Sequence, residues 1–227
     1  EGLSQATIRA IAQDSTGLMW FGTQDGLNRF DGYDFKTFYR DSQVLGTISD
    51  NHILSLASDH PRTGLWIGTQ SRGLNFLDLK LERFRAYRAG QFGLNSDQIN
   101  SLVLNANGTL WLATGAGVTH FDPNTERVLS HLAIPGANFV TLDAQGASIV
   151  ATSSGVLRAV SGQLQRWPDE PWRYGAAQVV TLDRAGEVWV GLTNGGLLHF
   201  NASGMLLQHF KKQVSEKLAA EADAARC

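Results

Sequence analysis

Short apolar-rich runs recur along most of the chain, and each is followed by a turn that contains Asp or Asn and then Gly. The acid or amide of such a turn bonds the backbone ahead of it, and Gly supplies the positive φ that closes a short hairpin. The pattern predicts strands at residues 8–13, 53–58, 99–104, 139–142 and 179–182. A helical repeat would show apolar residues at a spacing of about 3.6 and few glycines, and neither feature is present.

A longer motif follows each of these strands. It consists of a Trp between apolar residues, Gly-Thr, a short connection, Gly-Leu and Phe-Asp, and its copies cover residues 18–31, 65–78, 110–122, 149–158 and 188–201. The anchors Trp20, Trp66, Trp111, Ile149 and Trp189 are 46, 45, 38 and 40 residues apart. We expect the recurrent Trp residues in the core and the recurrent Asp31, Asp78 and Asp122 as caps of turns. A short outer strand completes the unit, most clearly at residues 35–39, 84–87 and 206–210.

Four short strands in each repeat of this length are typical of a propeller blade. The predicted fold class is therefore all-β, a β-propeller of four-stranded antiparallel blades. The propeller covers residues 1–210, with five blades at about 4–40, 49–88, 96–132, 136–167 and 176–210. Residues 211–227 contain strong helix formers and no Gly, which predicts a helical or disordered tail.

Composition excludes some partners. The 24 Gly among 227 residues agree with many tight turns, and a net charge of −2 offers no basic field for a nucleic acid. No apolar run approaches the roughly 18 residues of a membrane span, so a membrane would be reached only through flanking segments absent from this sequence. The single cysteine, Cys227, forms no internal disulfide, and a start at Glu1 without Met is expected of a piece of a longer protein.

The motif also distinguishes between propeller families. WD-repeat blades end in Trp-Asp and kelch blades carry a double Gly, and neither pattern recurs here. The string of an apolar residue, Trp, an apolar residue, Gly-Thr, Gly-Leu and Phe-Asp resembles the two-component regulator propeller repeat, most closely over residues 2–14 and 22–32. The resemblance extends from residue 2 to about 210, and it is weakest in the fourth unit, which lacks the Trp.

The resemblance implies a location and a role. Propellers of this family form the extracytoplasmic sensory part of bacterial membrane receptors, ahead of a hybrid histidine kinase or a diguanylate cyclase, and they commonly have seven blades. We therefore expect a periplasmic module that senses a carbohydrate or another polar small molecule and passes the signal on through blade packing or homodimer geometry. The five blades either close into a ring or form part of a seven-bladed one.

The loops around a channel mouth are the expected binding site, because function on a fixed scaffold usually resides in its loops. The connections from second to third strand and from one blade to the next share one face. They carry a hydrogen-bonding set that suits a sugar, with ordinary hydrated loop residues as the alternative: Gln24, Asp25, Asn51, His52, Gln70, Arg72, Asp97, Gln98, Asn138, Gln178, Thr193 and Asn194. From this set we select Gln24, Asp25, Asn51, His52, Arg72, Gln98 and Asn194 as ligand-binding candidates.

Three aromatic residues outside the repeat pattern, Trp167, Trp172 and Tyr174, complete the candidate site. They lie on the connection between the fourth and fifth units. Aromatic rings there would stack on a sugar or anchor a partner protein. The alternative is that they fill the space beside the thin fourth blade.

An enzyme is the rival interpretation, as a glycoside hydrolase or lyase on the same fold, and a scaffold for protein contacts is a third. The six histidines show no metal-ligand spacing, and no phosphate loop or nucleophile elbow is present. We therefore predict no catalytic residues, no metal and no cofactor. A cluster of Arg, Glu and Tyr at the channel mouth would favour the enzyme, and a broad exposed apolar patch near Trp167 and Trp172 would favour the scaffold.

Overall fold

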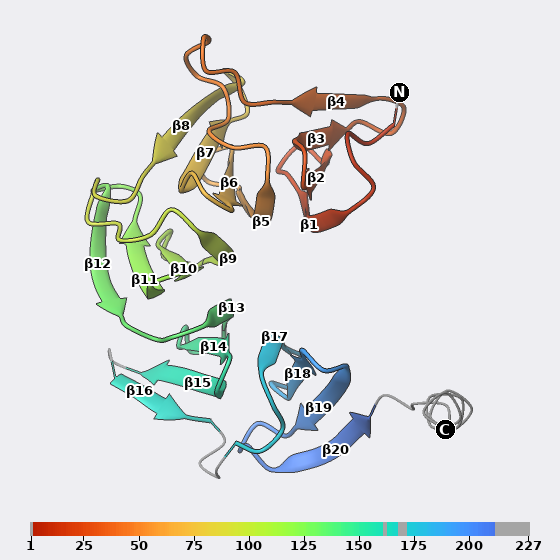
Figure 1. The fold of residues 1–227 in the computed structure, drawn as a ribbon, viewed down its shortest axis with the longest axis vertical. Helices are drawn as coiled ribbons and strands as arrows, with labels where there is room; N and C mark the ends of the chain where they lie inside the picture. Colours follow the sequence, from red (N-terminus) through yellow and green to blue (C-terminus); the bar gives the residue numbers. More distant parts are fainter. Residues whose placement is uncertain (1, 161–162, 168–171, 212–227) are drawn as a thin grey trace, which may run out of the picture.

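The computed structural model describes residues 2–160, 163–167 and 172–211, and these form five four-stranded antiparallel sheets (Figure 1). The predicted fold class is thereby confirmed. Within the described ranges, no helix is long and apolar enough to span a membrane. The predicted tail lies outside these ranges except for Lys211, which ends the last strand.

The twenty strands follow one another in chain order. The first sheet contains β1 (Ile8–Gln13), β2 (Met19–Thr23), β3 (Leu27–Phe30) and β4 (Phe35–Phe38). The second contains β5 (Ile53–Asp59), β6 (Gly64–Thr69), β7 (Leu74–Asp78) and β8 (Arg83–Tyr87). The third contains β9 (Ile99–Leu104), β10 (Leu110–Thr114), β11 (Gly117–Asp122) and β12 (Arg127–Leu132). The fourth contains β13 (Ala137–Leu142), β14 (Ser148–Thr152), β15 (Gly155–Val160) and β16 (Gln163–Arg166). The fifth contains β17 (Ala177–Leu182), β18 (Val188–Leu192), β19 (Gly196–Phe200) and β20 (Leu206–Lys211).

Each sheet is one blade, and blades 1 to 5 lie in an arc with their first strands around a common centre (Figure 1). Neighbouring first strands pack against each other, β1 on β5, β5 on β9, β9 on β13 and β13 on β17. Among the described strands, β17 and β1 do not pack in this way, so the arc is open between blade 5 and blade 1.

The burial of equivalent residues shows how the blades hold together. Each blade has one face that is turned toward the next blade along the chain, and we call this its onward face. Leu197, on the onward face of blade 5, is 37% exposed. The residues at the same register position of blades 1 to 4 are at most 2% exposed: Leu27, Leu74, Val118 and Val156. Each of these four blades thus buries its onward face on the next blade, whereas the described residues provide no such partner for blade 5.

A turn between the first and second strands fixes the Trp of a blade. In blade 2 the Asp59 carboxylate accepts a hydrogen bond of 2.8 Å from Trp66 Nε1, and in blade 1 Asp14 accepts one of 2.7 Å from Trp20 Nε1. Both Trp side chains are 1% exposed. The prediction that these two Trp residues belong to the core is confirmed.

The same prediction is too strong for the Trp residues of blades 3 and 5, which are only partly buried. Trp111 stacks on His120 with ring centroids 4.2 Å apart, and Trp189 stacks on His199 at 3.8 Å. For Trp189 the physical reason is the open end of the arc, because no described blade covers that face.

The recurrent Asp residues after the third strands cap turns, as predicted. Asp31 Oδ1 accepts hydrogen bonds from the backbone N–H groups of Tyr33 and Asp34. Asp78 and Asp122 make equivalent bonds to the residues that follow them. These carboxylates satisfy backbone donors that a tight turn would otherwise leave without partners.

Acid should destabilise the protein through Asp14. Burial raises the pKa of this carboxyl, but hydrogen bonds from Thr16, Trp20 and Leu18 outweigh burial and hold the pKa below its ordinary value of 3.8. A lowered folded-state pKa stabilises the fold above the unfolded-state value, and this contribution disappears as pH falls through the folded-state value. We expect the free energy of unfolding, measured with urea, to decrease from about pH 4 downward. Asp14→Asn should make that decrease shallower, and an unchanged slope in the variant would contradict this assignment.

Candidate functional site

A cavity of about 560 Å³ lies at the centre of the arc and is lined by all five blades. This volume falls within the range of about 300–1,000 Å³ that is typical of small-molecule sites. The wall combines amide and hydroxyl groups with aliphatic side chains. The lining residues are Arg9, Ala10, Ile11, His52, Leu54, Ser55, Leu56, Gln70, Gln98, Asn100, Ser101, Leu102, Asn138, Phe139, Gln178 and Val179.

One position of every innermost strand reaches this cavity because the strand bulges there. The register between first and second strands shifts once in each blade, and the residue passed over has no partner: Arg9, Leu54, Asn100, Asn138 and Gln178. All five of these bulge residues line the cavity. Since a β-bulge re-aims the side chain of its extra residue, the repeat itself produces this ring, in which four of the five side chains are polar.

Two bulge residues also connect neighbouring blades. Asn100 Nδ2 donates to the carbonyl of Ala137 at 2.8 Å, and Asn138 Nδ2 donates to the carbonyl of Ala177 at 2.8 Å. Gln98 Nε2 donates in turn to Asn100 Oδ1 at 2.8 Å. A change in the wall of the cavity therefore acts directly on the contacts between blades 3, 4 and 5.

Two polar atoms of blade 2 remain unsatisfied beside the cavity. His52 Nε2 and Ser55 Oγ are buried and have no hydrogen-bond partner among the described residues, although both side chains contribute to the lining. A buried polar atom without a partner costs about 1–3 kcal/mol.

The charge of the cavity is small and positive. Arg9 is the one Lys, Arg, Asp or Glu among the lining residues, and it is exposed. Every other polar group in the wall is a neutral amide or hydroxyl, apart from the imidazole of His52. The combination of Arg, Glu and Tyr expected of a propeller hydrolase is therefore absent from this lining.

The structure brings two of the predicted ligand-binding residues, His52 and Gln98, to the cavity. The remaining loop candidates lie outside its lining: Gln24, Asp25, Asn51, Arg72 and Asn194. Part of this group stabilises the loops instead, since Asn51 accepts from Gly26 N at 2.7 Å and donates to Asp25 Oδ1 at 3.1 Å. Whether any of them contacts a ligand stays a prediction.

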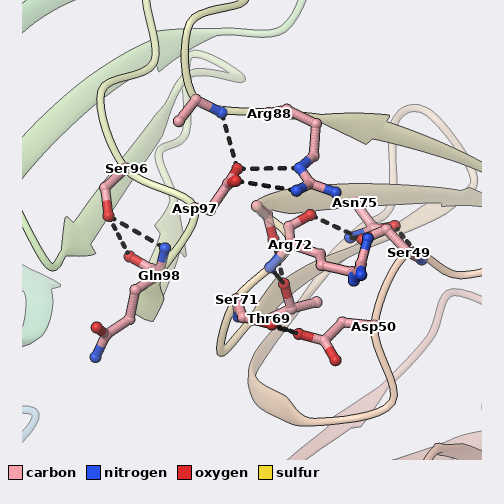
Figure 2. Close-up of polar contacts among 12 residues, drawn as sticks. Ser49, Asp50, Thr69, Ser71, Arg72, Asn75, Arg88, Ser96, Asp97 and Gln98 are labelled. Atoms are coloured by element: carbon pink, nitrogen blue, oxygen red, sulfur yellow. Dashed lines mark hydrogen bonds and ion pairs between the residues drawn. The ribbon is translucent and has the colours of Figure 1, made fainter.

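Figure 2 shows polar contacts among the loops of blade 2 and the connection to blade 3. Asp97 accepts hydrogen bonds from the Arg88 guanidinium at 3.0 and 3.1 Å and from Ala89 N at 2.8 Å. Burial raises the pKa of Asp97, but the bonds from Arg88 and Ala89 outweigh burial and lower it. The carbonyl of Asp97 accepts from Gly73 N at 2.8 Å, which ties the loop between β6 and β7 to the next blade. Much of this polar face is thus satisfied internally.

The three aromatic candidates pack against blade 5. Trp167, Trp172 and Tyr174 are partly buried beside the hydrophobic cluster of blades 4 and 5, and all three rings contact the ring of Phe200. Trp172 also covers the backbone of Gly155, where an added Cβ would lie 2.5 Å from the indole. This arrangement agrees with the packing alternative.

Sequence reasoning missed the innermost layer of the site. Arg9, Leu54, Ser55 and Asn100 were assigned to ordinary strands, where alternate side chains face the neighbouring blades. Gln70, Asn138 and Gln178 belong to the predicted loop-face set but not to the predicted ligand-binding residues. Five of these residues share a positional signal, because the bulge residue always lies five positions before the Asp or Asn of the following turn: Arg9, Leu54, Asn100, Asn138 and Gln178.

Comparison with known proteins finds a family match in the first blade. The family model described as "Two component regulator propeller" matches residues 2–25. The histidine kinase P4 of Formosa agariphila is 45% identical over 49 residues, which are 22% of this chain and 4% of that protein. The chain thus corresponds to a small part of the kinase.

Solved structures share the fold at low sequence identity. The extracellular domain of a hybrid two-component system of B. thetaiotaomicron has a TM-score of 0.79 and 23% identity, covering 90% of this chain and 30% of that one. Virginiamycin B lyase from Staphylococcus aureus has a TM-score of 0.70 and 12% identity, covering 94% and 72%. At these identities the likenesses show the fold and not the activity.

The fold is that of a β-propeller, and its first repeat matches the regulator type. Residues 2–25 match the model of the two-component regulator propeller family, and the Gly-Thr and Gly-Leu motifs of the other blades resemble its repeat.

Proposed function

We propose that this propeller is the extracytoplasmic sensor module of a bacterial two-component receptor and that it binds a carbohydrate or another polar small molecule in its central cavity. The observation that carries the proposal is the ring of bulge residues, which brings polar side chains from blades 1, 3, 4 and 5 to one cavity. The family match supports the sensory role.

The chemistry of the wall suits a polyhydroxylated ligand. Amide side chains both donate and accept hydrogen bonds, as sugar hydroxyls do. Leu54, Leu56 and Phe139 offer apolar surface to the C–H faces of a sugar ring. Arg9 supplies a cation that would favour a ligand with a negative group over its neutral analogue.

Signal transmission would begin at the contacts between blades. Because Asn100 and Asn138 line the cavity and also bond the next blade, a ligand that competes for their amides would alter the packing of blades 3 to 5. In the complete receptor this change would reach a histidine kinase or a diguanylate cyclase, directly or through the geometry of a homodimer.

A binding screen tests the proposal. Neutral and acidic mono- and oligosaccharides are titrated into the chain by calorimetry after a thermal-shift screen. We expect saturable binding of one class, weakened about tenfold by Gln70→Ala or Gln178→Ala, since each removes a hydrogen-bonding amide from the wall. Gln208→Ala is the matched control, because Gln208 is exposed on the outermost strand β20.

Two outcomes would count against the proposal. Affinity that survives both cavity substitutions would move the binding site away from the cavity. If Asn194→Ala or Trp172→Ala alone abolished binding, the loop and aromatic candidates predicted from the sequence would replace it.

A further inference from the structure

Three side chains of blade 5 that could coordinate a metal ion meet outside the cavity. Ligand atoms of Asp183, Glu187 and His199 all lie within 4.8 Å of one another, and His199 Nε2 is 2.8 Å from Glu187 Oε2. Asp183 and Glu187 lie at the two ends of the turn between β17 and β18, and His199 lies on β19. The sequence showed no metal-ligand spacing because the cluster forms only when these strands pair.

The imidazole is held in place by its neighbour. The rings of His199 and Trp189 stack with centroids 3.8 Å apart and an interplanar angle of 11°. His199 pairs in register with Trp189, so strand pairing itself sets this stack. The stack orients the His199 ring so that Nε2 faces Glu187. A ligand that is already oriented loses less conformational entropy on binding an ion.

The Asp183 carboxylate makes a longer hydrogen bond to the Trp of its blade than Asp14 and Asp59 make to theirs. Its Oδ1 accepts from the N–H groups of Ala185 and Glu187, as the turn requires. Its Oδ2 is 3.5 Å from Trp189 Nε1, whereas the equivalent distances are 2.7 Å for Asp14 and 2.8 Å for Asp59. The longer contact in blade 5 leaves Oδ2 available to another partner.

The other blades show that the turn does not need this set of side chains. At the three equivalent positions, blade 3 has Asn105, Thr109 and His120, and there His120 Nε2 lies 2.8 Å from Thr109 Oγ1 with the same ring stacking on Trp111. The turn of blade 3 therefore forms with an amide and a hydroxyl at the two positions that carry carboxylates in blade 5. Two carboxylates with an imidazole occur together at these positions in blade 5 alone among the five blades.

The geometry points to a binding site on blade 5 for a divalent transition-metal ion, with Zn²⁺ as the best match, formed by Asp183, Glu187 and His199. Zn²⁺ takes imidazole nitrogen at about 2.0–2.1 Å and carboxylate oxygen at about 2.0–2.2 Å, often with three protein ligands and one open position. A set with one imidazole suits Zn²⁺ better than Mg²⁺ or Ca²⁺, which prefer oxygen ligands alone. The site is independent of the cavity and of the proposed sensing.

The test is a calorimetric titration of Zn²⁺ into untagged, chelator-treated chain that carries Cys227→Ser, so that a free thiol does not contribute. We expect one site per chain and a rise in the melting temperature with Zn²⁺, because an ion that binds only the folded state stabilises it. His199→Ala and Glu187→Gln should each weaken binding at least about tenfold. His120→Ala, the equivalent histidine of blade 3, should leave binding unchanged.

The opposing interpretation is a plain ion pair between His199 and Glu187. It predicts no Zn²⁺ heat and no Zn²⁺-dependent stabilisation, and a loss of stability in the absence of Zn²⁺ with either His199→Ala or Glu187→Gln. That result would overturn the metal site, as would Zn²⁺ binding that survives His199→Ala. Crystals soaked in Zn²⁺ provide a second readout, in which an anomalous peak away from these three residues would also refute the proposal.

Discussion

Trp66→Ala should lower the free energy of unfolding by about 4 kcal/mol, the largest loss expected from a single substitution in this chain. The indole is 1% exposed and lies between blades 2 and 3, where its ring contacts Phe76, Tyr87 and Phe121. Its removal opens a void between two blades. It also takes away the donor that Asp59, a fully buried carboxylate, accepts at 2.8 Å.

The equivalent substitution in blade 5 is the matched control. Trp189 occupies the same place in the repeat, but it is partly exposed at the open end of the arc. Trp189→Ala should cost only about 1 kcal/mol, because less apolar surface returns to water. Urea unfolding followed by far-UV circular dichroism measures both variants, and Trp66→Phe replaces Trp66→Ala if the latter does not fold. Equal losses at the two positions would show that the blades do not bury their onward faces as described.

Gly73→Ala should cost about 3 kcal/mol or more and disturb the loop between β6 and β7. Gly73 has a φ of 78°, and an added Cβ would lie 2.1 Å from the carbonyl oxygen of Tyr87. Since that oxygen belongs to the backbone, the loop has to move, and the hydrogen bond from Gly73 N to the carbonyl of Asp97 would weaken. The substitution therefore combines backbone strain with a steric clash.

Gly186→Ala separates these two contributions. Gly186 has the same φ of 78°, but an added Cβ would meet nothing within 4 Å. This variant should lose only the roughly 1–2 kcal/mol that a left-handed conformation costs a residue with a side chain. If the two variants proved equally stable in urea, the close approach between blade 2 and its loop would be disproved.

The repeat made the fold predictable, because the spacing of its Trp residues and the position of its turns both indicate four-stranded blades. The Trp anchors gave the blade spacing, and Asp or Asn followed by Gly gave the hairpins. Even the fourth unit, with Ile149 in place of Trp, forms four strands, since Ile149 is buried in the same position. The exposed faces of blades 1 and 5 were not predictable in detail, because burial there depends on which blades meet in space.

The candidate binding site was only partly predictable, for a different reason. Loop residues such as His52 and Gln98 are recognisable because they interrupt the strand pattern, and both line the cavity. The bulge residues share a position but not a residue type, as Arg9, Leu54 and Asn100 illustrate. A bulge arises from pairing with the next strand, so its effect on side-chain direction appears only in the folded blade.

The central claim is that the cavity between the five innermost strands binds the ligand, and a crystal structure of the chain with the tightest compound from the saccharide screen tests it most directly. We predict ligand density between β1, β5, β9, β13 and β17, with polar contacts to bulge residues such as Asn138 and Gln178 and to His52 or Ser55 of blade 2. A ligand bound only at the outer loops, or stacked on Trp172 and Tyr174 with the cavity unchanged, would contradict the account.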